Sequence, residues 1–291
     1  MSCKNSLRKS HALLEATADG DLLQRNGLDN FETIWSLDAP WVEEPNFRRQ
    51  GWSGVGSLTL TGSAGEPVVV YLKRQENHAY RSLLSPWRLR PTAFREYKRL
   101  RDMHAAAVAA PEVLYYGERQ TGKALQAILI TREVPQSIAF EDYMQLASKR
   151  PASEVRQVLQ DTARLIGRLH RHRLQHCALY GKHVLISGYQ RGKPTSALPD
   201  QQLAPYLIDV EKTRRRPSRV VIALRDLNQF FRHAPWTDTQ WEAFLDHYVI
   251  ACRMKGLKSL LGWLIQRKAR RKQPDLSRTA GEQPMKDTHR A

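Results

Sequence analysis

The chain has 291 residues, of which 41% are hydrophobic and 26% charged, the composition of a globular protein large enough to bury a core of its own. Its 46 Lys and Arg residues against 29 Asp and Glu give a formal net charge of +17, which implies an anionic partner. The sequence lacks the run of about eighteen apolar residues of a transmembrane helix, and it lacks the apolar segment of a secretory signal. Its three widely spaced cysteines fit free thiols in a reducing cytoplasm and argue against a disulfide framework or a zinc site.

The first part of the chain predicts a small, β-rich unit preceded by an extension. Residues 1–45 are rich in acids and include Trp35 and Trp41, and we interpret them as an irregular N-terminal extension with short helical pieces. Over residues 46–134, alternating apolar residues between glycine-containing turns predict strands, and one three-residue apolar repeat predicts a helix. The expected strands are Ser57–Leu60, Val68–Leu72, Val113–Tyr116 and Leu125–Thr131, and the expected helix is Pro91–Ala107.

Helical periodicity dominates residues 135–272, which we expect to form a second and larger unit. Beyond this unit, residues 273–291 have the polar composition of a disordered tail. A polar turn with Gly192 and Pro194 separates two short apolar strands. The expected helices are Ala152–His172, Val220–Arg232 and Thr237–Lys255, and the expected strands are Val184–Ile186 and Tyr206–Ile208.

The segment from His170 to Ser187, HRHRLQHCALYGKHVLIS, follows the catalytic-loop pattern of a protein-kinase-like phosphotransferase with one change. That loop runs His-Arg-Asp, four residues, a metal ligand and a short apolar strand. Here His176, Cys177 and Ala178 take the first three places, and His183 takes the place of the metal ligand. Because alanine cannot accept a proton, the usual general base of the loop is missing.

Other residues follow the kinase pattern in chain order. Lys73 closes an apolar strand, where a kinase carries the lysine that contacts the α- and β-phosphates, and Glu96 on the next helix is its candidate partner. Asp209 follows a strand after the loop, at the place of the metal-binding aspartate. A turn with Gly54 and Gly56 precedes Lys73 and is the candidate phosphate cradle, although an ordinary hairpin has the same pattern. His183 also fits a packing histidine bonded to the backbone.

Together these residues resemble the bacterial lipopolysaccharide kinases of the Kdo/WaaP family and, within it, the InaA-like branch. The resemblance extends from about Asn46 to His233. It rests on Lys73, on FREYKRL with Glu96, on QHCALYGKHVLI, on LIDVEKTRRRPS with Asp209, and on LRDLNQFF with Asp226, which we interpret as a brace of the loop. It implies an α+β, protein-kinase-like bilobal fold with a small β-rich N-lobe and a larger helical C-lobe. It also implies ATP and Mg²⁺ as cosubstrates, and phosphoryl transfer to a heptose or Kdo sugar of the lipopolysaccharide core.

Two departures from the family pattern leave the activity open. Active sugar kinases of the family carry aspartate at the place of Ala178, and Glu211 stands where the glycine of Asp-Phe-Gly would be. A general base contributes about 10²–10⁴-fold, so its loss predicts a slow enzyme in which His176, or a carboxylate from elsewhere in the chain, takes the proton and Lys182 steadies the phosphate. The alternative is a pseudokinase scaffold or nucleotide-sensing module that binds an anionic partner.

The basic residues suggest what that partner is. A cluster over residues 81–101 and the amphipathic segment 256–272 fit a lipopolysaccharide core or another anionic glycolipid, and the segment also fits an anionic inner-membrane surface. Both also fit ordinary solvated faces. Nucleic acid is the weakest interpretation, because it rests on charge and on Tyr80 and Trp87 as stacking platforms. We therefore expect a cytoplasmic protein, either free or peripheral to the inner membrane.

Overall fold

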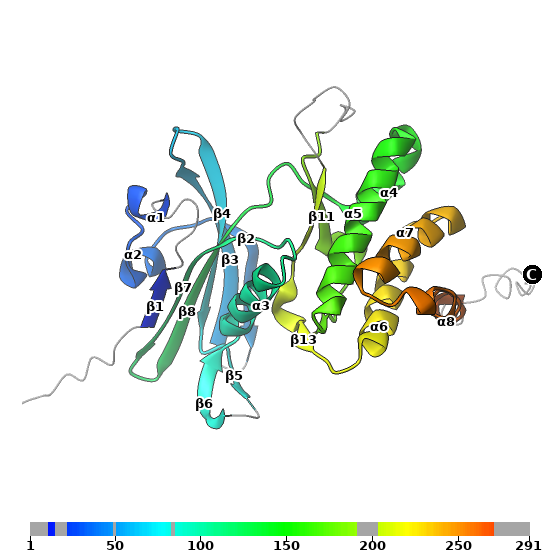
Figure 1. The fold of residues 1–291 in the computed structure, drawn as a ribbon. Coiled ribbons are helices and arrows are strands. Elements are labelled where there is room, and N and C mark those ends of the chain that lie inside the picture. The colour runs from blue at the N-terminus through cyan, green and yellow to red at the C-terminus, as the bar shows by residue number, and fades with distance from the viewer. Residues whose placement is uncertain (1–10, 15–21, 49–50, 83–84, 191–202, 271–291) are drawn as a thin grey trace, which may run out of the picture.

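The computed structural model describes residues 11–14, 22–48, 51–82, 85–190 and 203–270. Within these ranges the chain forms an N-terminal part built on an antiparallel sheet and a mainly helical C-terminal part, which lie side by side (Figure 1). The predicted tail of residues 273–291 and the turn with Gly192 and Pro194 lie outside the described residues.

The N-terminal part is organised around a sheet of strand order β1-β7-β8-β4-β3-β2, six strands within the described residues. Helix α3 packs on the side of this sheet that faces the helical part (Figure 1). The element bounds are β1 His11–Leu14, α1 Leu22–Arg25, α2 Phe31–Trp35, β2 Trp41–Arg48, β3 Gly51–Thr61, β4 Pro67–Glu76, β5 Ala79–Ser82, β6 Ser85–Pro91, α3 Ala93–Ala105, β7 Val113–Thr121 and β8 Ala124–Arg132.

The residues predicted as an N-terminal extension contribute to this part. β1 pairs with β7, and α1 and α2 bury Leu22, Phe31 and Ile34 against the opposite face of the sheet from α3. There they meet Leu72 and Ile130 in a second, smaller hydrophobic core. The boundary at residue 45 stays a prediction, and the structure adds that chain segments on both sides of it pack on one sheet.

The C-terminal part buries the main core around the long helix α5, which the structure confirms with the inward stripe expected from its apolar repeat. Its other helices, α6, α7 and α8, gather on one side of α5 (Figure 1). The bounds are β9 Ile138–Ala139, α4 Phe140–Gln145, α5 Ala152–Arg171, β10 Leu174–Gln175, β11 Val184–Ser187, β12 Ala204–Leu207, β13 Arg214–Arg215, α6 Arg219–Arg232, α7 Asp238–Ala251 and α8 Lys258–Arg270.

The expected elements are confirmed, with shifts at their ends. The helix predicted over Thr237–Lys255 ends at Ala251, because Arg253 lies in the left-handed region at φ 57° and the chain turns there into α8. Its start is fixed by a capping box between Thr237 and Gln240. Among the helices in the described ranges, none is both long enough and apolar enough to cross a membrane.

Candidate active site

A cavity of about 350 Å³ lies between the sheet and the helical part. It brings together residues that are far apart in the sequence, from β3, β4, α3, β8, β11 and the end of β12. Apolar side chains and charged groups share its wall. Its lining includes Val55, Tyr71, Lys73, Glu96, Leu129, Glu133, Leu185, Ile208 and Asp209.

Lys73 lies on β4, whose neighbours on both sides are strands β3 and β8. Its Nζ donates to Glu96 Oε2 at 2.6 Å and to Glu211 Oε2 at 3.1 Å. Burial by itself would lower the pKa of Lys73, but the two carboxylates outweigh it and raise the pKa above its ordinary value. The amine is therefore a fixed cation at neutral pH.

The position of Glu96 is set by the contact between α3 and β4. Gln75, two residues after Lys73, accepts hydrogen bonds at its Oε1 from the Thr92 hydroxyl at 3.0 Å and from the Ala93 amide at 2.8 Å. These bonds hold the first turn of α3 against the lysine strand. The sequence prediction that Lys73 and Glu96 meet is thus fulfilled in geometry, and their contact with a nucleotide stays a prediction.

His183 and Asp209 form a second pair. The Nδ1 of His183 is 2.8 Å from the carbonyl oxygen of Ala178, and its Nε2 is 3.6 Å from Asp209 Oδ2. Because a carbonyl can only accept, Nδ1 carries a proton, which leaves Nε2 as the ring nitrogen that could ligate a metal beside the carboxylate. Asp209 is held in the left-handed region at φ 54°.

This donor set fits part of a divalent metal site. Among the described residues no group of three or more His, Cys, Asp or Glu side chains is arranged to hold a metal. An imidazole nitrogen and a carboxylate oxygen would therefore supply two ligands, and nucleotide phosphates and water would supply the others, as is common for Mg²⁺. Asp209 and His183 fit the group that the kinase pattern implies.

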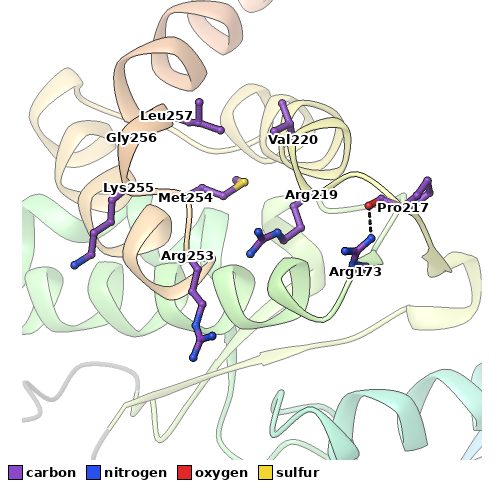
Figure 2. A pocket seen from close by; sticks show the side chains of 9 residues that line it. All are labelled: Arg173, Pro217, Arg219, Val220, Arg253, Met254, Lys255, Gly256 and Leu257. Atoms are coloured by element: carbon purple, nitrogen blue, oxygen red, sulfur yellow. Dashed lines mark hydrogen bonds between the residues drawn. The ribbon is translucent and has the colours of Figure 1, made fainter.

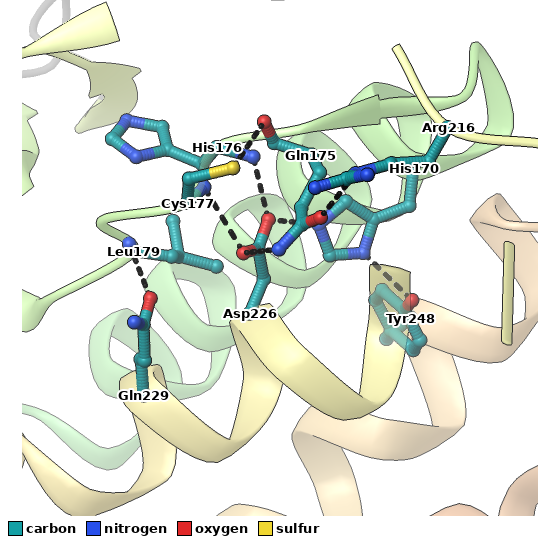
Figure 3. A network of polar contacts seen from close by, with 9 residues as sticks. All are labelled: His170, Gln175, His176, Cys177, Leu179, Arg216, Asp226, Gln229 and Tyr248. Carbon is teal, nitrogen blue, oxygen red and sulfur yellow. Dashed lines mark hydrogen bonds and ion pairs between the residues drawn. The ribbon is translucent and has the colours of Figure 1, made fainter. Parts of the chain in front are cut away.

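The loop that carries Ala178 is held from below by Asp226, a side chain with no solvent exposure (Figure 3). Its carboxylate accepts hydrogen bonds from the backbone amides of His176 at 2.6 Å and Cys177 at 3.1 Å. It also accepts from the imidazole of His170 and from the side-chain amide of Gln175. Asp226 thus braces the loop, as expected from the sequence.

The two catalytic candidates lie away from the cavity wall. His176 is fully buried, with its Nε2 donating to the carbonyl of Ile208 at 3.0 Å, and burial lowers the pKa of its imidazole. Lys182 is exposed in the short turn Gly181–His183, next to the metal-ligand candidate. Neither residue lines the cavity. Ala178 itself is only 2% exposed.

The two glycines predicted to cradle phosphate have a packing role. A Cβ on Gly54 would lie 2.4 Å from the ring of Trp41, and one on Gly56 would lie 2.9 Å from the Cβ of Ala39. Both glycines therefore let the start of β2 and the residues just before it approach β3 closely. Their predicted contact with phosphate stays a prediction.

Two site features were missed from the sequence. Glu211, noted only as a replaced glycine, is the second carboxylate on Lys73. Tyr71 also lines the cavity, and its hydroxyl donates to Glu133 Oε1 at 3.1 Å. The two-residue period of a strand was the available signal, because it places Tyr71 on the same face of β4 as Lys73.

Comparison with known proteins agrees with this geometry. The model of the lipopolysaccharide kinase (Kdo/WaaP) family matches residues 32–248, a range that includes every site residue described above. The chain belongs to this family. It is 28% identical over 223 residues to Protein InaA of Escherichia coli K12, covering 76% of this chain and 95% of InaA. It is 30% identical over 194 residues to the lipopolysaccharide core heptose(I) kinase WaaP of Pseudomonas aeruginosa, covering 66% of this chain and 68% of WaaP.

A solved structure shows the same fold. The structure titled WaaP in complex with acyl carrier protein aligns with a TM-score of 0.62 at 21% identity, over 90% of this chain and 98% of that one. The protein-kinase-like bilobal fold and the resemblance to the InaA-like branch, both predicted from the sequence, are confirmed.

Proposed function

We propose that the protein is an ATP-dependent phosphotransferase of the lipopolysaccharide kinase type that acts on a heptose or Kdo sugar of the core. One observation carries the proposal: the Lys73–Glu96 ion pair at 2.6 Å and Asp209 line one cavity, although they come from different parts of the fold, and His183 stands behind Asp209 with its Nε2 3.6 Å from Oδ2. A fixed cation and a pair of metal-ligating side chains are the two charge-stabilising groups that phosphoryl transfer requires. Family membership supports the acceptor class.

Each side chain has a defined part in this proposal. Lys73, oriented by Glu96, binds the α- and β-phosphates, and the apolar wall of Val55, Leu129 and Leu185 receives the base. Asp209 and His183 hold Mg²⁺, which when bound neutralises charge on the phosphates. Gly54 and Gly56 are proposed to shape the phosphate side of the cavity through the path of β3.

The missing base leaves proton removal to another group. Lys182, which is exposed and precedes His183 in the sequence, is proposed to steady the transferring phosphate and not to take the proton. His176 would have to leave its bond to Ile208 before its ring could accept the proton of the sugar hydroxyl. Since the transition state is loose, transfer proceeds with late proton loss, and we expect a slow enzyme.

A second candidate function is a pseudokinase that binds nucleotide, or none, and acts as a scaffold for an anionic partner. Two observations favour it. Glu211 Oε2 lies 3.1 Å from Nζ of Lys73, the lysine that would bind phosphate, and Ala178 has no side-chain group that could take a proton. The two candidates differ in whether ATP is consumed.

Calorimetry with Mg²⁺-ATP tests the nucleotide site, with Lys73→Met and Asp209→Asn as variants and the exposed Lys123→Gln as the matched charge control. We expect binding to the natural chain and to the control, and its loss in both site variants. A transfer assay from labelled ATP to isolated core sugars then distinguishes the candidates. Binding with no transfer to any acceptor supports the pseudokinase, and no binding at all would end the enzyme proposal.

We also propose a cytoplasmic location at the inner-membrane surface, where ATP and a lipopolysaccharide acceptor meet. Helix α8, with exposed Leu260 and Trp263 beside Arg267 and Lys268, supports a peripheral contact of this kind. The acyl carrier protein bound to WaaP is a further partner to test by co-purification. The location is checked by comparing the membrane and soluble fractions of cells that express a tagged chain.

A further inference from the structure

A second cavity, of about 520 Å³, lies at the base of the helical part (Figure 2). It shares no lining residue with the cavity around Lys73. Four of its lining residues are cationic, and none of the lining residues that the structure describes is acidic. The cations are Arg173, Arg219, Arg253 and Lys255. No other cavity described above has this charge pattern, and nothing in the proposed phosphotransfer uses it.

The four cations come from three separate segments. Arg173 lies in the turn between α5 and β10, Arg219 is the first residue of α6, and Arg253 and Lys255 lie in the link between α7 and α8. Figure 2 shows these segments close together, with the side chains of Arg253 and Lys255 directed outward from the link between α7 and α8. Convergence of distant segments on one charge sign is unexpected for a surface that is only solvated, because like charges raise one another's energy.

Two of the guanidinium groups are held in place. Arg173 Nη1 donates to the carbonyl of Pro217 at 2.5 Å, and Arg219 Nη1 donates to the carbonyl of Cys252 at 3.0 Å. Neither bond neutralises charge. The side chains of Arg253 and Lys255 make no hydrogen bond or ion pair within the described part of the chain. The site therefore keeps four uncompensated positive charges, of which two are preorganised.

The backbone at two of these positions adds an independent sign. Arg173 and Arg253 both adopt left-handed conformations, at φ 61° and φ 57°, just after the ends of α5 and α7. Glycine is the residue that relieves strain at such helix ends. Both positions instead carry arginine, and both arginines line the same cavity. The strained backbone thus occurs at two positions where it places an arginine at the cavity.

We propose that this basic pocket, defined by Arg173, Arg219, Arg253 and Lys255, binds a phosphate group. Guanidinium groups match the oxygens of phosphate with paired hydrogen bonds, and the N-terminal end of α6 adds positive potential at the same place. The lining contains no aromatic side chain, so it offers no platform for nucleobases. Apolar Val220, Met254 and Leu257 can instead cover the group that carries the phosphate.

The test uses a double variant, Arg253→Gly with Lys255→Gln. Glycine at the left-handed position removes strain, so a loss of binding cannot be attributed to a loss of folding, and a thermal melt checks this. The matched control, Lys123→Gln with Arg156→Gln, removes the same charge from exposed positions outside the pocket. All proteins also carry Lys73→Met, which separates this pocket from the nucleotide cavity, so the result does not depend on the proposed function.

Two probes distinguish the source of the phosphate. Inorganic phosphate is titrated by calorimetry at low salt, and vesicles of phosphatidylcholine with or without phosphatidic acid are tested by co-sedimentation. We expect the pocket variant to bind at least about tenfold more weakly than the control with one probe or both. Loss with phosphate indicates a free or soluble phosphate ligand, and loss with vesicles alone indicates a lipid phosphate. Equal binding by variant and control, or no binding by either, overturns the proposal.

Discussion

Two charged groups in this protein are taken out of water in different ways. Asp226 is fully buried, and its carboxylate accepts from two loop amides and two side chains. Lys73 is 18% exposed, stands at a cavity wall and contacts two carboxylates. The first group is satisfied by hydrogen-bond donors of the loop that it braces and of α5. The second is a single positive charge in contact with two negatively charged carboxylates.

This difference distinguishes a residue that stabilises the fold from a residue that can bind a ligand. A buried group whose hydrogen bonds are complete has nothing left to offer a ligand, and its removal exposes the whole network. A partly exposed cation shared between carboxylates can exchange one of them for a phosphate. Asp226 thus holds the loop that carries Ala178, where the kinase pattern would place a carboxylate, and the following variants test this division.

The largest effect is expected for Asp226→Ala. The change leaves the amides of His176 and Cys177 buried without an acceptor, and we expect the free energy of unfolding to fall by about 3 kcal/mol or more. Urea unfolding measures this. Asp226→Asn keeps one acceptor oxygen and should lose less. A loss under about 1 kcal/mol for the alanine variant, the size expected of surface pairs, would remove Asp226 from its role as brace.

Acid should destabilise the same loop through His176. Burial lowers the pKa of its imidazole in the folded protein, so the unfolded chain binds a proton first as pH falls below about 6.5. The stability is complete above that pH and is lost on acidification, with a slope of at most about 1.4 kcal/mol per pH unit. Urea midpoints of His176→Asn against the natural chain from neutral to acidic pH measure it. Identical slopes would contradict the assignment.

The sequence predicted much of this division, and the reasons for its failures are physical. The apolar repeat of α5 and the alternation of β4 report burial directly, so the elements were found. Lys73, Glu96, His183 and Asp209 were placed together by their order along a known pattern. The role of Gly54 was missed because its neighbour, the ring of Trp41, comes from a segment interpreted as irregular.

Contacts between separate segments explain the other failures. Glu211 follows Asp209 by two residues, and only the turn after β12 directs its carboxylate to Lys73 on β4. The basic pocket joins residues as far apart as Arg173 and Lys255, and no local pattern connects them. Composition showed an excess of positive charge but could not say where cations without partners gather.

Removing Glu211 should strengthen nucleotide binding. Glu211→Gln takes away the carboxylate that competes with phosphate for Lys73, and we expect ATP to bind several-fold more tightly, in line with a single partly exposed ion pair. Glu96→Gln is the control, because it removes the carboxylate that orients the amine and should weaken binding. Calorimetry gives both values. If the two variants changed affinity in the same direction, the distinction between an orienting and a competing carboxylate would be lost.

The smallest effect, and the sharpest contrast with Asp226, is expected for the stability of Lys73→Met. Glu96 and Glu211 lose their cation, but both are partly exposed at the cavity and can be hydrated there. Partly exposed ion pairs contribute about 0–1 kcal/mol, so the free energy of unfolding should change by less than about 1 kcal/mol while ATP binding is abolished. Urea unfolding of the variant beside Asp226→Ala makes the comparison. A loss as large as that of Asp226→Ala would mean that Lys73 belongs to the scaffold.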